Sequence, residues 1–152
     1  MHFFSQKYIV VNSDFNNGNI MLDILIIEDC RDLSKDYREI LDNLGLTSQI
    51  INDPSDIIAL YQKKQITFKV LIMDLELNCG PLDGLTLYKF LALHFDRFIP
   101  VIISGNIKTS NMADLALECT SHLLKKPFNV ESFTGLLKQC LKEYDEKFGS
   151  LK

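Results

Sequence analysis

Short apolar runs alternate with segments of helical periodicity from residue 21 to the end of the printed sequence. Five of the runs are almost continuously aliphatic, which is typical of strands that are buried on both faces of a parallel sheet. These predicted strands cover residues 21–28, 46–51, 69–74, 98–104 and 121–125. The predicted helices follow them one by one, at residues 31–45, 52–64, 83–95, 106–119 and 129–148.

The helical segments carry their own start and stop signals. In the first segment, the apolar residues that share one helical face are Leu33, Tyr37, Ile40, Leu41 and Leu44. Gly45 is a natural end for this helix, because glycine adopts the left-handed conformation without strain. In the second segment, Asp53 is a candidate N-cap and Pro54 suits the first helical position, where no amide donor is needed.

Strands that alternate with helices predict βαβ units. We therefore expect an α/β fold, with a doubly wound, flavodoxin-like sheet of five parallel strands in the order 2-1-3-4-5 and helices on both faces. This domain is predicted to cover residues 21–152. Residues 1–20 are predicted to form an N-terminal extension, either an arm or an extra edge strand, because a polar stretch separates the strand-like residues 7–12 from the repeating pattern.

Charge and apolar content argue against two classes of partner. The 16 Lys and Arg residues against 20 Asp and Glu residues give a net charge of −4, whereas sequence-independent nucleic-acid binding relies on basic side chains. The longest apolar runs are far shorter than the roughly 20 residues that a membrane span requires. Residues 1–19 lack the features of a signal peptide. We therefore expect a cytoplasmic protein that binds neither nucleic acid nor membrane.

The four cysteines and three histidines are scattered along the chain. No two cysteines form a C-x-x-C pair, and no histidine lies at metal-ligand spacing. We expect reduced thiols and ordinary histidines here, and not a metal site or nucleophile built on these residues.

Acidic side chains stand at the ends of two predicted strands. Residues 21–28 lead into the pair Glu28 and Asp29, and residues 69–74 end in Asp74. In the order 2-1-3-4-5 these strands are neighbours at the point where the strand order reverses, so their carboxyl ends line a crevice. Three carboxylates in one crevice repel one another, and a hard cation with oxygen ligands relieves the repulsion. The pattern therefore favours a magnesium site.

The fourth and fifth predicted strands also lead into polar residues. Residues 98–104 end in Ser104, which offers a hydroxyl group, although serine is common at any strand end. Residues 121–125 are followed by Lys126, a compact point charge that could meet the acidic cluster.

Plainer interpretations of these residues remain open. Asp74 could be a turn carboxylate, if the polar residues at the other strand ends were coincidental. Glu28 and Asp29 could cap the following helix, a role that is compatible with metal binding. Lys126 could be a solvated surface lysine, which is the role that we expect for Lys125.

An acidic pair, a lone aspartate, a hydroxyl and a Lys-Pro pair, each at the end of the appropriate strand, resemble the receiver domain of two-component response regulators, the CheY-like superfamily. The resemblance covers about residues 22–148. It implies a magnesium site formed by Glu28 through water, Asp29, Asp74 and the main-chain carbonyl of Glu76. The implied catalytic residues are Asp74, as the phosphoacceptor, with Ser104 and Lys126 contacting the phosphoryl oxygens.

The resemblance also implies a function in phosphorelay signal transduction. Asp74 would take a phosphoryl group from a histidine kinase or a histidine phosphotransfer protein, and the modification would switch binding to a downstream protein. Such a domain accepts and slowly loses its own phosphoryl group, so we do not expect an enzyme with a separate substrate. We expect a monomer or a weak homodimer.

Three other functions fit the same fold. A degenerate receiver would act as a docking module without phosphoryl chemistry. A flavin or nucleotide protein would need a Gly- or Ser/Thr-rich loop after the first strand, where this chain has the acidic residues 28–36. A phosphatase with an aspartate nucleophile would need a second aspartate two residues after Asp74, where this chain has Glu76.

The chain departs from the receiver pattern at two places. Leu123 stands where many receivers carry Tyr or Phe, the aromatic residue that swings inward when the hydroxyl moves to the phosphoryl group. The loop 74–84 is longer than the pattern expects. The first departure puts the usual coupling to the surface in doubt, and the second changes the loop that shields the site.

Overall fold

The computed structural model describes residues 20–53, 56, 57, 59, 66–74, 84–105 and 122–149. Within them, five parallel strands form one sheet in the order β2-β1-β3-β4-β5, which confirms the predicted topology. The strands are β1 (Ile20–Ile27), β2 (Ser48–Ile51), β3 (Ile66–Asp74), β4 (Ile99–Ser104) and β5 (Leu123–Lys125). The longer helices are α2 (Arg31–Asn43), α4 (Gly84–His94) and α6 (Val130–Phe148).

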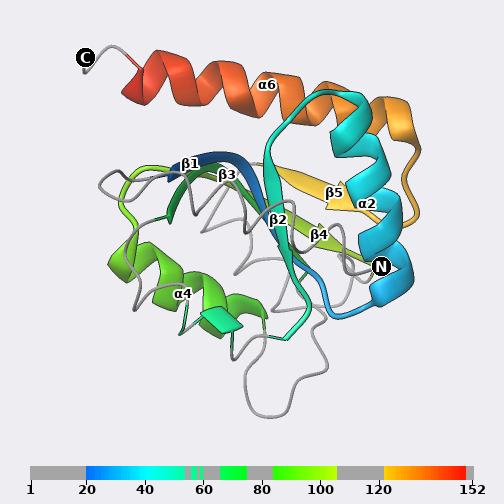
Figure 1. Cartoon of the computed structure of the whole chain (residues 1–152), viewed down its shortest axis with the longest axis horizontal. Coiled ribbons are helices and arrows are strands. Elements are labelled where there is room, and N and C mark those ends of the chain that lie inside the picture. Colours follow the sequence, from blue (N-terminus) through cyan, green and yellow to red (C-terminus); the bar gives the residue numbers. More distant parts are fainter. Residues whose placement is uncertain are drawn as a thin grey trace.

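The sheet separates two apolar clusters, one on each face (Figure 1). Successive side chains of a strand point to opposite faces, so Ile24 and Ile26 belong to one cluster and Leu25 and Ile27 to the other. Helices α2 and α6 cover the first face and α4 covers the second. Both faces of the sheet are therefore buried, as the aliphatic runs predict.

Three strands differ by two or more residues from the sequence pattern. Strand β2 begins at Ser48, two residues later than predicted. Strand β3 begins at Ile66, earlier than predicted, because Ile66 and Thr67 pair with Ile20 and Met21 at the start of β1. Strand β5 is shorter than predicted and lies at an edge of the sheet, where it pairs with β4 alone among the described strands. The extent of each strand thus depends on the neighbour that it pairs with.

Helix α2 begins at Arg31 and stops before Gly45, as predicted, but its N-cap is not an acidic residue. Gly45 has a φ of 72°, its N–H donates to the carbonyl of Asp42 at 3.0 Å, and the N–H of Leu46 donates to that of Leu41 at 3.0 Å. This pair of bonds is a Schellman motif. At the other end the N-cap is Cys30, which makes no side-chain capping bond. The proposed capping role of the preceding acidic pair is therefore wrong, because those residues lie before the cap.

Several predicted features lie outside the described residues. They are the N-terminal residues 1–19, most of the helix at 52–64, the helix at 106–119 and residues 75–83, which include Glu76 and the loop predicted to be longer than the receiver pattern. In the part of the chain that the structure does describe, no helix combines the length and the hydropathy that a membrane span needs.

Burial in the central strands predicts how much the free energy of unfolding falls when a side chain is truncated. Leu71 in β3 is fully buried, so Leu71→Ala should lower the free energy of unfolding by about 2–5 kcal/mol. Leu93 in α4 is 82% exposed, so Leu93→Ala should change it by less than about 0.5 kcal/mol. Urea denaturation measures both variants. Equal effects would contradict the packing described for β3.

Candidate functional site

The carboxyl ends of four strands meet at one edge of the sheet. Glu28 and Asp29 follow β1, Asp74 is the last residue of β3, Ser104 is the last residue of β4, and Lys126 follows β5. The register keeps these ends level, since Asp74 pairs with Ile103 and Ser104 with Lys125. The fold therefore brings together the residues that the sequence suggested for the site, with the exception of Glu76, which lies outside the described residues.

Carboxylate oxygens of Glu28, Asp29 and Asp74 lie within 4.8 Å of one another. Glu28 and Asp74 are 2% and 5% exposed, while Asp29 is half-buried. Oxygen donors from two or three carboxylates in a small space suit Mg²⁺, which retains several waters and accepts few protein ligands. The residues present therefore fit the cation that the sequence predicted.

Lys126 lies directly against the acidic group. Its Nζ donates to Asp74 Oδ2 at 2.7 Å and to Glu28 Oε1 at 3.2 Å. Its side chain is 21% exposed, so this salt bridge from Lys126 to the two carboxylates is only partly open to water. Lys126 is thus no surface lysine, whereas its neighbour Lys125 is exposed, as predicted.

Burial and charge change the proton affinity of two groups in the site. Burial, with the nearby charge of Asp74, raises the pKa of Glu28 to about 7, although Lys126 opposes the shift. Burial alone would lower the pKa of Lys126, but its hydrogen bond to Asp74 and the two negative charges outweigh this and raise the pKa. Lys126 is therefore held as a cation between two carboxyl groups.

The backbone after β1 is tied to the end of β2. The Asn52 amide donates to the Glu28 carbonyl at 2.7 Å and to Ser34 Oγ at 2.6 Å. Ser34 Oγ in turn donates to the Cys30 carbonyl at 3.0 Å. Sequence reasoning missed Asn52 and Ser34. The available signal was an amide residue placed directly after the strand that borders the acidic pair.

Ser104 is the last residue of β4, and Leu123 is the first residue of the neighbouring strand β5. Ser104 is 3% exposed, and its carbonyl accepts a hydrogen bond from the Lys126 N–H at 2.9 Å. Leu123 is half-buried and packs against the same cluster as α4. A leucine therefore fills the place for which the sequence pattern expects an aromatic ring.

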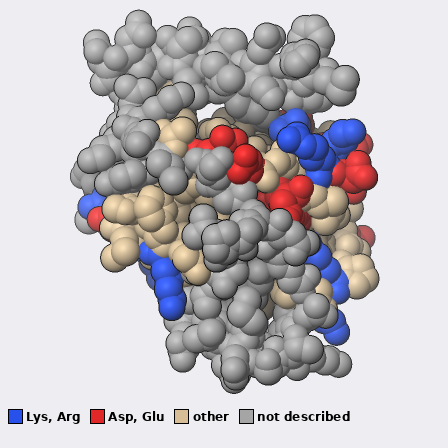
Figure 2. All heavy atoms as spheres, turned by 90° about the horizontal axis from the view of Figure 1, so that it is seen from below, with Lys and Arg blue, Asp and Glu red and all other residues tan. Residues whose placement is uncertain are grey.

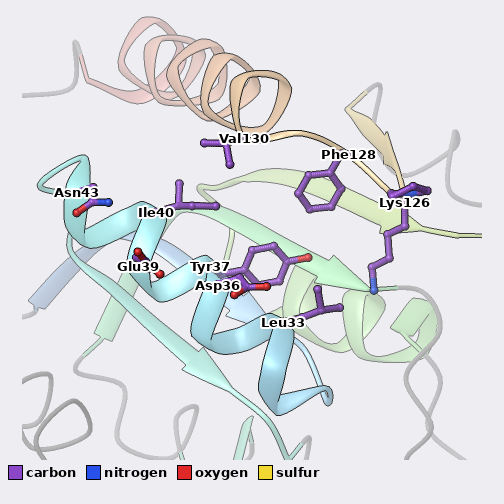
Figure 3. Close-up of a pocket in the computed structure, with 10 residues that line it drawn as sticks. Leu33, Asp36, Tyr37, Glu39, Ile40, Asn43, Lys126, Phe128 and Val130 are labelled. Carbon is purple, nitrogen blue, oxygen red and sulfur yellow. The ribbon is translucent and has the colours of Figure 1, made fainter.

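A groove with a volume of about 730 Å³ lies beside the site, between α2 and the segment 126–130 (Figure 3). Tyr37 forms part of its floor and stacks on Phe128, with 6.1 Å between the ring centroids. Leu33, Ile40 and Val130 add apolar walls. The Tyr37 hydroxyl is buried and has no hydrogen-bond partner among the described residues. Sequence reasoning assigned Leu33, Tyr37, Ile40 and Val130 to apolar helix faces and missed the groove.

The charges on the outer surface are mixed. On the face seen in Figure 2, Lys and Arg side chains lie next to Asp and Glu side chains over the described residues. This mixture agrees with the modest net charge of −4.

One comparison with known proteins identifies the family, and another shows the same fold in solved structures. The model of the response regulator receiver domain family matches residues 24–138. The solved CheY-like receiver domain protein from Methanospirillum hungatei JF-1 aligns with a TM-score of 0.71 and 18% identity, over 86% of this chain and 99% of that one. A search of curated proteins finds no match.

Two further solved receiver domains have the same fold. The signal receiver domain of an HD domain-containing protein from Pseudomonas fluorescens Pf-5 gives a TM-score of 0.71 at 16% identity, over 84% of this chain and 98% of that one. The beryllofluoride-activated NtrC4 receiver domain dimer, solved in solution, gives 0.67 at 22% identity, over 80% and 98%.

The bridge predicts that removal of Lys126 destabilises the metal-free protein. Lys126→Met leaves two buried carboxylates without their cation, so the free energy of unfolding at pH 8 in chelator should fall by about 1–3 kcal/mol. Adding Asp74→Asn to that variant should restore at least half of the loss, because one of the repelling charges is gone. Urea denaturation compares the proteins. A Lys126→Met variant as stable as the unmodified chain would contradict the bridge.

Proposed function

Because the chain belongs to the response regulator receiver domain family, we propose that Asp74 accepts a phosphoryl group from a histidine kinase or a histidine phosphotransfer protein. The single observation that supports this most is the Asp74 carboxylate, which is 5% exposed and lies 2.7 Å from the Lys126 ammonium. A buried nucleophile beside a fixed cation suits the transfer of an anionic group.

The proposed transfer is a nucleophilic displacement at phosphorus. A carboxylate oxygen of Asp74 bonds to phosphorus as the bond from phosphorus to the donor's imidazole nitrogen breaks, and the imidazole leaves with the electron pair. The product is an acyl phosphate. Lys126 supplies positive charge close to the phosphoryl oxygens, and the Ser104 hydroxyl is the group at the end of β4 that could donate to one of them.

Glu28, Asp29, Asp74 and the main-chain carbonyl of Glu76 are the residues proposed to hold Mg²⁺. The carboxylate oxygens of Glu28, Asp29 and Asp74 lie within 4.8 Å of one another, so one cation could be held by all three, and the family pattern would give Asp29 direct contact and Glu28 contact through water. When bound, Mg²⁺ neutralises charge on the transferring phosphoryl group. It also offsets the repulsion among the three carboxylates.

The proposed reaction modifies the domain itself and does not convert a separate substrate. Water later attacks phosphorus, the phosphorus–oxygen bond to Asp74 breaks, and the carboxylate is restored. We propose a cytoplasmic signalling role in which the phosphorylated state binds a downstream protein differently. Leu123 has no hydroxyl or ring to move between surface and interior, so we propose that the response through β5 is weak.

The groove beside α2 is the proposed docking place for the phosphodonor protein. Lys126 lines this groove and also contacts Asp74, so a protein that occupies the groove lies next to the acceptor. The apolar walls suit the apolar face of a helix, and Val130 at the margin is 57% exposed. This docking would give the donor's phosphohistidine a short path to the carboxylate.

Phosphorylation by a small donor tests the chemistry. Incubation with acetyl phosphate and Mg²⁺ should add one phosphoryl group, seen by intact mass, and Asp74→Asn should abolish the addition because the nucleophile is lost. Omission of Mg²⁺ should slow the labelling of the unmodified chain at least about tenfold. An unmodified chain that is never labelled would favour the alternative, a docking module without phosphoryl chemistry. Labelling that persists in Asp74→Asn would rule out the assigned acceptor.

If the phosphodonor protein docks in the groove, a change in the groove should slow labelling by that protein but not labelling by a small donor. Val130→Glu places a charge at the margin of the groove, and the first turn of α6 tolerates an acidic residue. Labelling by a phosphorylated histidine phosphotransfer domain should slow at least about fivefold, while labelling by acetyl phosphate should not change. The matched control is Leu93→Glu, on a different surface, which should change neither rate. Equal slowing in both variants would argue against the groove.

A further inference from the structure

Asn52 is the first residue after β2, and its side chain reaches across to the loop that follows β1. Its Nδ2 donates to the Glu28 carbonyl oxygen at 2.7 Å and to Ser34 Oγ at 2.6 Å. A primary amide has two N–H groups, so each of these bonds can use its own hydrogen. One side chain therefore holds a point on the loop and a point on helix α2 at the same time.

Ser34 extends this connection to a second point on the loop. It is 4% exposed, and its hydroxyl donates to the Cys30 carbonyl at 3.0 Å while it accepts from Asn52. The two carbonyl groups that are held in this way belong to Glu28 and Cys30. They flank Asp29, which is the proposed direct ligand of Mg²⁺.

The loop needs this support because regular strand pairing ends just before it. The paired residues of β1 and β2 end with Ile27 and Ile51, and the Glu28 N–H donates to the Ile51 carbonyl at 3.0 Å. Asp29 and Cys30 follow this last bond. Repulsion among the three carboxylates favours rotation of the Asp29 peptide away from Asp74. Hydrogen bonds to the flanking carbonyls oppose that rotation.

We propose that Asn52, acting through Ser34, is a positioning residue for the carboxylates that hold the divalent cation. The proposal rests on the proposed function, since it concerns the same site. Asn52 touches neither the cation nor the phosphoryl group in this account. It fixes the backbone from which Glu28 and Asp29 project, so that the ligands are in place before the cation arrives.

The same pair of strands carries a matched connection at the opposite end. The Asp23 N–H donates to Thr47 Oγ1 at 2.9 Å, and the Thr47 N–H donates to Asp23 Oδ2 at 3.0 Å. This connection also joins β1 to the β2 side through side-chain and backbone groups. It lies just before the first paired residues of β1 and β2, Ile24 and Ser48, at the opposite end of their pairing from the acidic site, so its loss should affect stability alone.

The experiment measures Mg²⁺ binding by titration calorimetry at fixed ionic strength, together with the melting temperature in chelator. The proteins are the full chain and the variants Asn52→Leu, Ser34→Ala, Thr47→Val and Asp29→Ala. Asn52→Leu keeps the shape of the side chain and removes both donors. It should raise the dissociation constant for Mg²⁺ by about 10-fold to 100-fold.

The other variants should affect Mg²⁺ binding to different degrees. Ser34→Ala leaves the bond from Asn52 to the Glu28 carbonyl intact, so it should weaken Mg²⁺ binding by less than Asn52→Leu. Thr47→Val should lower the melting temperature and leave the dissociation constant unchanged. Asp29→Ala should abolish detectable binding, because a proposed ligand is removed.

The outcomes distinguish a failure of the Asn52 proposal from a failure of the proposed metal site. If Asn52→Leu lowers the melting temperature like Thr47→Val and binds Mg²⁺ as tightly as the unmodified chain, Asn52 has only a structural role and the positioning proposal is wrong. If the unmodified chain and Asp29→Ala bind Mg²⁺ equally, or neither binds it, the metal site of the proposed function fails, and the positioning proposal fails with it.

Discussion

A single lysine side chain makes the burial of two carboxyl groups possible at one edge of this sheet. Lys126 Nζ lies 2.7 Å from Asp74 and 3.2 Å from Glu28, and both acidic residues are almost fully buried. Without a compensating charge, such groups would protonate or turn outward. Burial, with the nearby charge of Asp74, raises the pKa of Glu28 to about 7, although Lys126 opposes the shift. Three carboxylates beside one lysine suit the proposed divalent cation, and Lys126 hydrogen-bonds Asp74, the proposed acceptor.

The rest of the fold serves to bring these groups together. The reversal of strand order between β1 and β3 places Asp74 beside the acidic pair, and β4 and β5 deliver Ser104 and Lys126 on the other side. Two apolar clusters, one on each face of the sheet, hold the strand ends level. Because the interior is closely packed, the positions of the strand ends are fixed by many contacts, while the side chains at the edge remain polar.

Much of this could be predicted from the sequence, because the information is periodic or lies at the ends of periodic segments. Aliphatic runs predict the strands, and the rule that parallel strands gather their carboxyl ends at one edge then places Asp74 close to Lys126. The remainder depends on neighbours that are distant in the sequence. Asn52 bonds to groups 24 and 18 residues away, and an isolated side-chain hydrogen bond leaves no periodic trace. The early start of β3 at Ile66 likewise depends on its partner in β1. Cys30 is the N-cap of α2 although cysteine carries no preference for that place.

The central claim is that the chain stores a phosphoryl group as an acyl phosphate on Asp74. The most direct measurement is reduction of the phosphorylated chain with borohydride, which converts an acyl phosphate to the corresponding alcohol, followed by peptide mass spectrometry. The account predicts homoserine in place of the aspartate at position 74 and at no other acidic position. A phosphorylated chain that resists reduction, or that carries the alcohol at position 28 or 29, would contradict it.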